Sequence, residues 1–493
     1  MERTGRTRVV VTLKKPSRDA PPLAVPILPR HIWSSVTRQE TPSFENEPPV
    51  GSGRFRLLES ADSDLIRLAR NEEHWSGPGP IDTVELRLFE SESAVAGALE
   101  RGEIDLADDL SPATLARLDG IANIGTHAAE TASFISLGVN AGAPRGNGSP
   151  ILRDARVRRA IAHALDRDAL RRQALGEYGV TGTTIVPPVS PFHAEPATDA
   201  LLDHDVEKAR RLLDRAGVRD DDGNGVRELR GGAPARLRLY TRSALPETEV
   251  LGTAIATALD AIGIPVQPET LTDRELERRI KGGRYDLFIW GWASEPDPDF
   301  ILSVLSCGEV GGPGLSDTYF CDPAYERLYQ QQRTTRSAAR RGRLVQELQL
   351  RAYREAPYVV LYYRPRLQAY RADRFVPSDD AGAGVLALAA DPASSIALEP
   401  VPGAPPPEEV PDTGLEAGAS DVAETSDSLR DELSEPRAWI VIGVAALLVL
   451  LALTLLLRRL RRARVVGATF DESDLETFEI DELEHDPDDL AGH

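Results

Sequence analysis

The sequence predicts an α/β protein, because apolar strand-like segments alternate with amphipathic helix-like segments along most of the chain. The length of 493 residues corresponds to roughly three domains at ~150 residues each and is enough to bury a large core. The composition, with 41% hydrophobic and 27% charged residues, indicates a folded, globular chain.

The first predicted elements lie before residue 170. Alternating apolar residues at 9–13 predict a strand, a helix begins after Ser91, and residues 133–140 predict a second strand. Residues 152–170 predict two helices with Asp154 and Asp166 as N-caps. Their apolar side chains share one face: Val157, Ala160, Ile161, Ala164 and Leu165.

The alternation continues downstream. The residues from Asp205 onward predict an amphipathic helix that ends at Gly217, and residues 237–240 predict a strand. A helix over about 247–262 and a strand restarting at 262–266 follow. The order of these elements carries the α/β prediction.

The net charge of −21 argues against nucleic-acid binding, because phosphate neutralisation needs a basic surface. Residues 399–493 hold 22 acidic and 7 basic residues, a net of −15, which leaves only −6 for residues 1–398. The acidic character therefore belongs mainly to the C-terminal part.

Residues 438–457 carry no charge over twenty positions, and a helix of that length spans about 30 Å. This predicts one membrane crossing; a buried core helix is the alternative. Five arginines follow at 458, 459, 461, 462 and 464, which places residues 458–493 in the cytoplasm and the N-terminal body outside. The tail after Arg464 is acidic and is expected to be disordered.

Two further expectations concern the ends of the body. Residues 399–437 are rich in Pro, Glu, Asp, Ser, Gly and Ala and predict an extended stalk. Residues 1–17 contain no apolar signal segment, although the predicted topology requires export. We therefore expect the natural chain to begin upstream; a body left in the cytoplasm is the alternative.

The order of the segments resembles the family 5 extracellular solute-binding proteins, the peptide, dipeptide and nickel receptors of ABC importers. The resemblance rests on eight stretches between residues 8 and 398: AVPILPRHIW, PVGSGRFRLLE, RNEEHWSGPGPIDTVELRLF, ALERGEIDLADDL, LRDARVRRAIAHALDRDAL, DVEKARRLLDRAGV, GRYDLFIWGWASEPDPDF and APYVVLYYR.

The resemblance implies a two-lobed, class II periplasmic-binding-protein-like fold with ligand between the lobes, which close by hinge motion. It places lobe one at 8–125, lobe two at 126–372 and a return to lobe one at 373–398. Family members carry further residues upstream, so the first lobe is expected to be incomplete here.

The function that this resemblance implies is capture of dipeptides or oligopeptides by a monomeric, membrane-tethered receptor. The receptor would deliver them to the permease and ATPase subunits of an ABC importer. Nickel complexes, heme or sugars are alternative ligands, and a surface sensor with a signalling tail or a non-functional fragment are alternative interpretations. No catalytic motif of the G-x-S-x-G, H-E-x-x-H or P-loop type occurs, so no enzyme activity and no cofactor is expected.

Candidate ligand-binding residues cluster in the stretch that contains Glu295. In dipeptide- and oligopeptide-binding members an ammonium-binding Asp falls at this position, so Glu295 is the candidate anchor for a peptide ammonium. A solvated loop carboxylate is the alternative. Trp290 and Trp292 are two residues apart and would share one side of a strand, either lining the cleft or packing within the lobe. Asp297 and Asp299 are expected to form a turn and cap a helix.

Two further residues complete the candidate site: Arg242, expected in the loop after the strand at 237–240, and Asn140. By resemblance, Arg242 pairs with a ligand carboxylate through its bidentate guanidinium, with a surface salt bridge as the alternative. Asn140 ends the strand at 133–140 and is either adjacent to the hinge or cleft, or a strand-end cap.

Cys307 and Cys321 are the only cysteines, and similar receptors have such a pair. Outside the cell they are expected to form a disulfide; a free thiol site or metal pair is the alternative. The stretch from Asp220 through Asp222 and Asn224 resembles the start of a calcium loop. Position twelve would be Gly231, where such a loop needs Glu, so a polar turn is favoured and no metal site is predicted.

Overall fold

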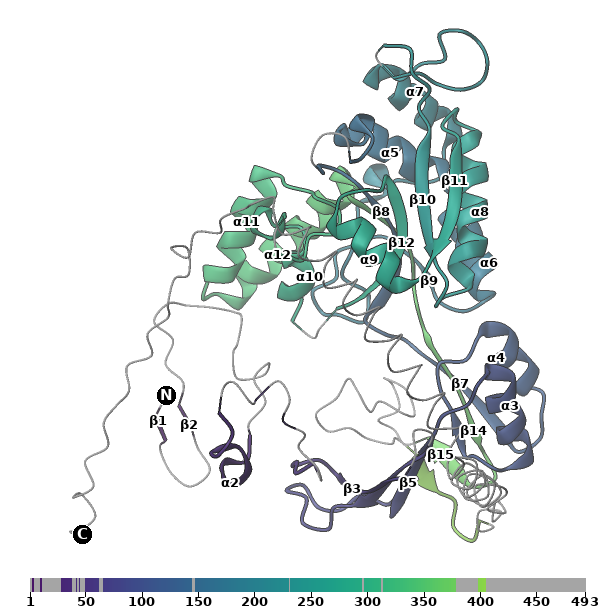
Figure 1. The fold of residues 1–493 in the computed structure, drawn as a ribbon, viewed down its shortest axis with the longest axis vertical. Coiled ribbons are helices and arrows are strands. Elements are labelled where there is room, and N and C mark those ends of the chain that lie inside the picture. Colours follow the sequence, from purple (N-terminus) through teal and green to yellow (C-terminus); the bar gives the residue numbers. More distant parts are fainter. Residues whose placement is uncertain are drawn as a thin grey trace, which may run out of the picture. The chain divides into compact units, whose positions relative to one another are not determined.

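The computed structural model describes residues 28–37, 41, 44, 49–61, 65–143, 147–229, 231–294, 297–311, 314–377 and 398–404, with the short strands β1 (Glu2–Arg3) and β2 (Val9–Val10) (Figure 1). The chain divides into two units, Met1–Glu408 and Glu409–His493, and the second lies outside the described residues. The expected membrane helix at 438–457, the cytoplasmic tail and Glu295 also fall outside them. Within the described residues, no helix is long and apolar enough to span a bilayer.

The centre of the fold is a six-stranded mixed sheet. Its order is β11 (Val266–Leu271), β10 (Leu237–Arg242), β12 (Leu287–Ala293), β8 (Ser133–Val139), β13 (Tyr358–Tyr363) and β9 (Val180–Thr181). Strands β11, β10 and β12 are parallel, whereas β8 runs antiparallel to both β12 and β13. Both faces of this sheet are covered by helices, as is typical of α/β proteins.

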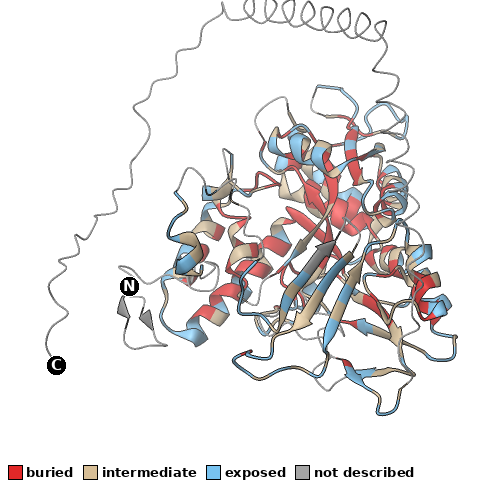
Figure 2. Cartoon of the chain, turned by 60° about the horizontal axis from the view of Figure 1, so that its bottom comes forward, coloured by how far each residue is buried: buried red, intermediate tan, exposed pale blue. Residues whose placement is uncertain are grey.

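The first face packs against α5 (Ala155–Ala164), α6 (Arg167–Leu175), α7 (Val206–Ala216) and α8 (Glu247–Asp260). Leu137, Leu239, Leu287 and Ile289 point from the strands into this core and are almost completely buried. In Figure 2 stretches of these strands and helices are coloured red, as buried.

The opposite face packs against α9 (Asp273–Lys281), α10 (Asp299–Ser303), α11 (Pro323–Thr334) and α12 (Ala338–Glu355). Phe134, Phe288 and Tyr358 contribute the strand side of this core. Three short 3₁₀ helices, η2 (Pro150–Arg153), η3 (Thr198–Ala200) and η4 (Cys307–Glu309), lie in the connections.

A second, smaller sheet has the order β6 (Leu106–Ala107), β14 (Arg366–Arg371) and β7 (Ile124–Ala129). Helices α3 (Glu92–Arg101) and α4 (Pro112–Leu118) pack on it through Leu99, Leu115 and Leu118. The remaining elements are α2 (Arg30–Trp33), the sheet β3 (Phe55–Ala61), β4 (Leu65–Arg70) and β5 (Thr83–Arg87), and the pair β15 (Phe375–Pro377) and β16 (Leu398–Pro400).

Two neighbouring strands connect the larger sheet to the smaller one. β7 continues into β8 through residues 130–132, and β13 continues into β14 through residues 364–365. Thr131 Oγ1 donates a hydrogen bond of 2.5 Å to the carbonyl oxygen of Arg364, and the Arg364 guanidinium lies 3.0 Å from Asp109. The chain therefore changes sheet at these two points; the expected lobe boundaries after residues 125 and 372 stay predictions.

Local signals predicted the helix ends correctly. The carboxylates of Asp154 and Asp166 accept hydrogen bonds from the first turns of α5 and α6, which confirms both N-caps. Gly217 ends α7 with a φ of 79°. The strand predicted at 237–240 is two residues longer, so Arg242 is the last residue of β10 and not part of the following loop.

Candidate ligand-binding site

The candidate site is built around β12, whose residues alternate between the two faces of the large sheet. Leu287 and Ile289 point toward the α5–α8 side, whereas Phe288 and Trp290 pack in the core on the α9 side. Trp292 packs on the same side, against the core that contains Phe134. The prediction that the two tryptophans share one side of the strand is confirmed, and both are half-buried.

Trp290 is covered by Arg242, whose guanidinium carbon lies 4.1 Å from the centroid of the indole ring. The same guanidinium donates two hydrogen bonds to Asp273, at 2.9 and 2.5 Å, and these lower the pKa of that carboxyl group. Arg242 thus already has an anionic partner, as in the salt-bridge alternative. A role for it toward a ligand carboxylate stays a prediction.

Trp292 is held by a residue that the sequence did not single out. Its Nε1 donates a hydrogen bond of 3.1 Å to Oδ2 of Asp317, and its ring meets Phe300 edge to face at 5.9 Å. Asp317 is 8% exposed, and burial raises its pKa from 3.8 to about 6. No local pattern identifies Asp317, because it follows a Gly-rich stretch that is typical of an exposed loop.

The loop that contains Glu295 is anchored at both of its described ends. On one side, the backbone N–H of Ser294 donates to the carbonyl oxygen of Ala132 at 2.7 Å. On the other side, Arg341 donates two hydrogen bonds to Asp297, at 2.7 and 2.5 Å. Glu295 itself lies outside the described residues, so its role as ammonium anchor stays a prediction.

Asp297 forms the expected turn, because its Oδ1 accepts the backbone N–H of Asp299 at 3.0 Å. The capping prediction is wrong, since the N-cap of α10 is Pro298 and no side chain caps the helix there. Asp299 has a further structural task, since it is buried and bonded to Gln332. Gln332 in turn accepts a hydrogen bond of 3.1 Å from Arg341. A buried polar network thus joins the start of α10 to α11 and α12.

Asn140 is almost completely buried at the end of β8. Its amide nitrogen donates to the carbonyl oxygens of Gly283, at 3.1 Å, and Tyr285, at 2.8 Å, and its oxygen accepts from the N–H of Ala143 at 2.9 Å. These bonds tie the strand end to the turn before β12. They match the strand-end alternative, and a contact between Asn140 and a ligand stays a prediction.

The expected disulfide between Cys307 and Cys321 is present, with 4.6 Å between the Cα atoms. It closes the segment that carries Asp317. The backbone N–H of Cys307 also donates to Glu326 on α11 at 2.8 Å, which fixes this segment to the helix that follows it.

Carboxylates gather in the loop at residues 220–228. Potential ligand atoms of Asp220, Asp222 and Glu228 lie within 4.8 Å of one another. Counted from Asp220, position twelve of an EF-hand spacing is Gly231, which offers no carboxylate. The third carboxylate of the loop comes from Glu228, four positions after Asn224. Oε2 of Glu228 accepts the N–H of Asp221 at 2.7 Å, and Asp220 accepts the N–H groups of Gly223 and Gly225. The loop is therefore a well-bonded polar turn.

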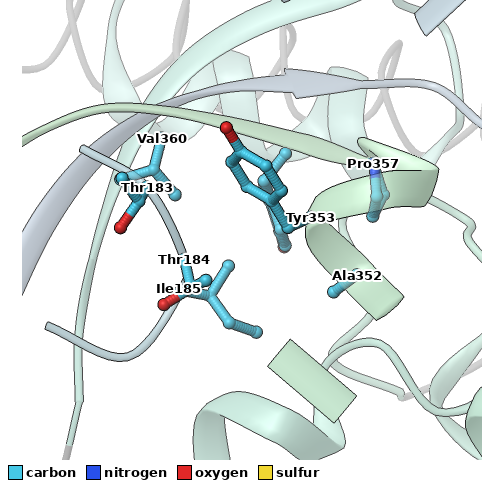
Figure 3. A pocket seen from close by; sticks show the side chains of 8 residues that line it. Thr183, Thr184, Ile185, Ala352, Tyr353, Pro357 and Val360 are labelled. Atoms are coloured by element: carbon cyan, nitrogen blue, oxygen red, sulfur yellow. The ribbon is translucent and has the colours of Figure 1, made fainter. Parts of the chain in front are cut away.

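A small pocket lies beside Tyr358 (Figure 3). Its empty space of about 190 Å³ includes open solvent and leaves almost no room for a water molecule, so it is far smaller than typical small-molecule sites. Thr183, Thr184, Ile185, Ala352, Tyr353, Pro357 and Val360 complete its lining. It holds none of the predicted ligand-binding residues.

Comparison with known proteins decides the family. The profile of the bacterial extracellular solute-binding proteins, family 5 Middle, matches residues 1–312. The chain belongs to this family. Its members bind solutes, which fits the absence of catalytic motifs in the sequence.

Curated relatives of this solute-binding protein include peptide-binding proteins. It is 27% identical over 400 residues to the probable di/tripeptide-binding protein 5 of Pseudomonas aeruginosa, covering 77% of this chain and 70% of that one. It is 22% identical to the oligopeptide-binding protein AppA of Bacillus subtilis, covering 68% of this chain and 61% of the relative. The chain thus spans about two thirds of the length of these relatives.

The solved structure of AppA from Bacillus subtilis, in complex with a nonapeptide, superposes with a TM-score of 0.61 at 21% identity, covering 73% of this chain and 71% of AppA. This likeness shows the fold, which is the two-lobed α/β type of periplasmic binding proteins. The two sheets connected by two crossings belong to that architecture.

Proposed function

We propose that this protein binds dipeptides or oligopeptides and delivers them to the permease of an ABC importer. The observation that carries the proposal is the pair Trp290 and Trp292, which lie on one side of β12 directly before a loop anchored at both ends. Half-buried aromatic side chains close to the anchored residues Ser294 and Asp297 suit a ligand with a regular backbone and variable side chains. The named peptide-binding relatives support this choice of ligand.

In this proposal Glu295 neutralises the peptide ammonium. A charge-assisted hydrogen bond to a carboxylate is strong only where its geometry is fixed, and the bonds of Ser294 and Asp297 fix the described residues on either side of this position. Arg242 and Asn140 take secondary roles, since both already bond within the protein. For Arg242 to receive a ligand carboxylate, it would have to share its guanidinium with Asp273.

The proposal also includes the tether. Residues 438–457 form a single membrane span, residues 399–437 a stalk, and residues 458–493 a cytoplasmic tail. The body, with lobe one at 8–125 and 373–398 and lobe two at 126–372, lies outside the cell. Tethering raises the effective concentration of the receptor at the permease. ATP hydrolysis belongs to a partner subunit.

Isothermal titration calorimetry of the full chain in mild detergent tests the peptide assignment. Tri-alanine should bind, and N-acetylated tri-alanine should bind at least about tenfold more weakly because it lacks the ammonium. Glu295→Gln should remove this preference for a free N-terminus. Glu277→Gln, an exposed carboxylate on α9, is the matched control and should keep it. Equal affinity for free and acetylated peptides in the unaltered chain would contradict the assignment of Glu295.

A further inference from the structure

Asp317 is a buried carboxylate whose two oxygens are used by two different strands. Oδ2 accepts the indole N–H of Trp292 on β12 at 3.1 Å, and Oδ1 accepts the hydroxyl of Tyr358 on β13. Its backbone carbonyl accepts the hydroxyl of Tyr285, which lies just before β12. The side chain therefore joins the disulfide-closed segment 307–321 to the two strands that flank β8.

Asp317 lacks the cationic partner that buried carboxylates usually have. Within the described part of the chain, no Lys, Arg or His nitrogen forms an ion pair with it, and its interactions are hydrogen bonds from neutral groups. Burying a carboxylate without a cationic partner costs free energy of folding. A neutral side chain at position 317 would therefore be expected to make the folded state more stable. The bond to Trp292 gives a reason for a carboxylate at this place.

We propose that Asp317 is a positioning residue of the ligand site, which fixes the orientation of the Trp292 indole through its Nε1. The inference rests on the proposed function, in which Trp292 contacts the ligand. An indole ring pivots about two side-chain torsions, and a hydrogen bond at Nε1 together with the edge-to-face contact to Phe300 holds both of them. The ring is then oriented before a ligand arrives, which lowers the entropic cost of binding.

Both oxygens of the ionised carboxylate accept a hydrogen bond, so protonation places an O–H donor at one of them and changes the bonding to Trp292 and Tyr358. Burial raises the pKa of this group to about 6, so the change falls in an accessible pH range. Among the described residues, the titratable groups bonded to Asp317 are Tyr285 and Tyr358, and Tyr319 and Asp286 in turn act electrostatically on Tyr285. Burial raises the pKa of all three tyrosines above the ordinary value of 10, and Asp286 is ion-paired with Arg238 at 2.8 Å.

The indole N–H signal of Trp292 tests the inference without any ligand. In the full chain with ¹⁵N-labelled tryptophan, Trp292→Phe assigns the signal among the five tryptophans. The signal should shift with pH around a midpoint of about 6 in the unaltered chain. Asp317→Asn keeps an acceptor oxygen but cannot ionise, so its signal should not titrate. Asp260→Asn, at an exposed position on α8, is the matched control and should titrate like the unaltered chain.

Affinity for tri-alanine gives the second measurement. Asp317→Leu should weaken binding about tenfold at pH 7.5, roughly the effect of one lost hydrogen bond. Asp317→Asn should recover part of that loss. In the unaltered chain, affinity should fall as the pH drops through about 6, and in Asp317→Asn it should not.

The outcomes separate the two proposals. A Trp292 signal that does not titrate in the unaltered chain, or that is the same in Asp317→Leu, would overturn the positioning role. Affinity that follows pH equally in Asp317→Asn and the unaltered chain would also overturn it. If Asp317→Leu does not fold, the asparagine variant and the pH series still decide. Absence of peptide binding combined with a titrating Trp292 signal would contradict the proposed function and leave the contact between Asp317 and Trp292 supported.

Discussion

Replacing Arg341 with methionine removes the side chain that holds the downstream end of the Glu295 loop. Arg341 lies on α12 with 4% of its side chain exposed. It donates two hydrogen bonds to Asp297 and one, of 3.1 Å, to the fully buried Gln332. Methionine has a similar volume and offers no donor, so the change removes these bonds with little loss of packing.

The expected loss of stability follows from these contacts. Breaking a fully buried ion pair typically costs about 3–5 kcal/mol. The side chain of Asp297 is 45% exposed and can be hydrated once Arg341 is gone, so this pair contributes only about 1 kcal/mol, as surface pairs do. Gln332 loses the donor to its buried oxygen, at about 1–3 kcal/mol. Together these give a destabilisation of about 2–4 kcal/mol.

Urea unfolding of the full chain, followed by far-UV circular dichroism, measures this loss. Arg343→Met, an exposed position on the same helix, should change stability by less than about 0.5 kcal/mol. A double-mutant cycle with Asp297→Asn isolates the pair. A coupling energy below about 0.5 kcal/mol would refute the reasoning, because the two side chains would then hold the loop independently.

Two further predictions concern the segment that carries Asp317. Replacing Cys307 and Cys321 together by alanine should lower stability by about 3 kcal/mol in urea unfolding, since the cysteines are 14 positions apart and the crosslink restricts the unfolded chain; a loss below about 1 kcal/mol would contradict this. The raised pKa of Asp317 should make the folded state bind more protons than the unfolded state between pH 3.8 and about 6. The contribution of Asp317 to stability should therefore fall as pH rises through this window, by about 3 kcal/mol for the rise in pKa from 3.8 to about 6. The stability difference between the unaltered chain and Asp317→Asn, measured from pH 4 to 7.5, isolates this contribution; a difference independent of pH would contradict it.

The sequence predicted the elements whose signals are local. Asp154 and Asp166 cap their helices because an Asp side chain at the N-cap bonds to the N–H groups of the next turn. Gly217 ends α7 because it adopts a positive φ without strain. The two tryptophans share a side of β12 because side chains alternate along a strand.

Contacts between distant segments were not predictable in this way. Asp317 bonds to Trp292, 25 positions earlier in the sequence, and to Tyr358, 41 positions later. Such long separations cannot be read from the short-range periodicity of a helix or strand. The partner of Arg242, Asp273, lies 31 residues further on, across the neighbouring parallel strand β11. Glu228 was not predicted as a member of the carboxylate cluster, because an EF-hand spacing expects the acidic ligand at position 231 and not at 228.

The central claim is that this chain binds peptides at the end of β12, and calorimetry on the full chain with a diverse library of di- to nonapeptides tests it most directly. The account predicts saturable binding of peptides with a free N-terminus, weakened at least about tenfold in Glu295→Gln and retained in Glu277→Gln. No binding anywhere in the library, or binding that Glu295→Gln leaves unchanged, would contradict it.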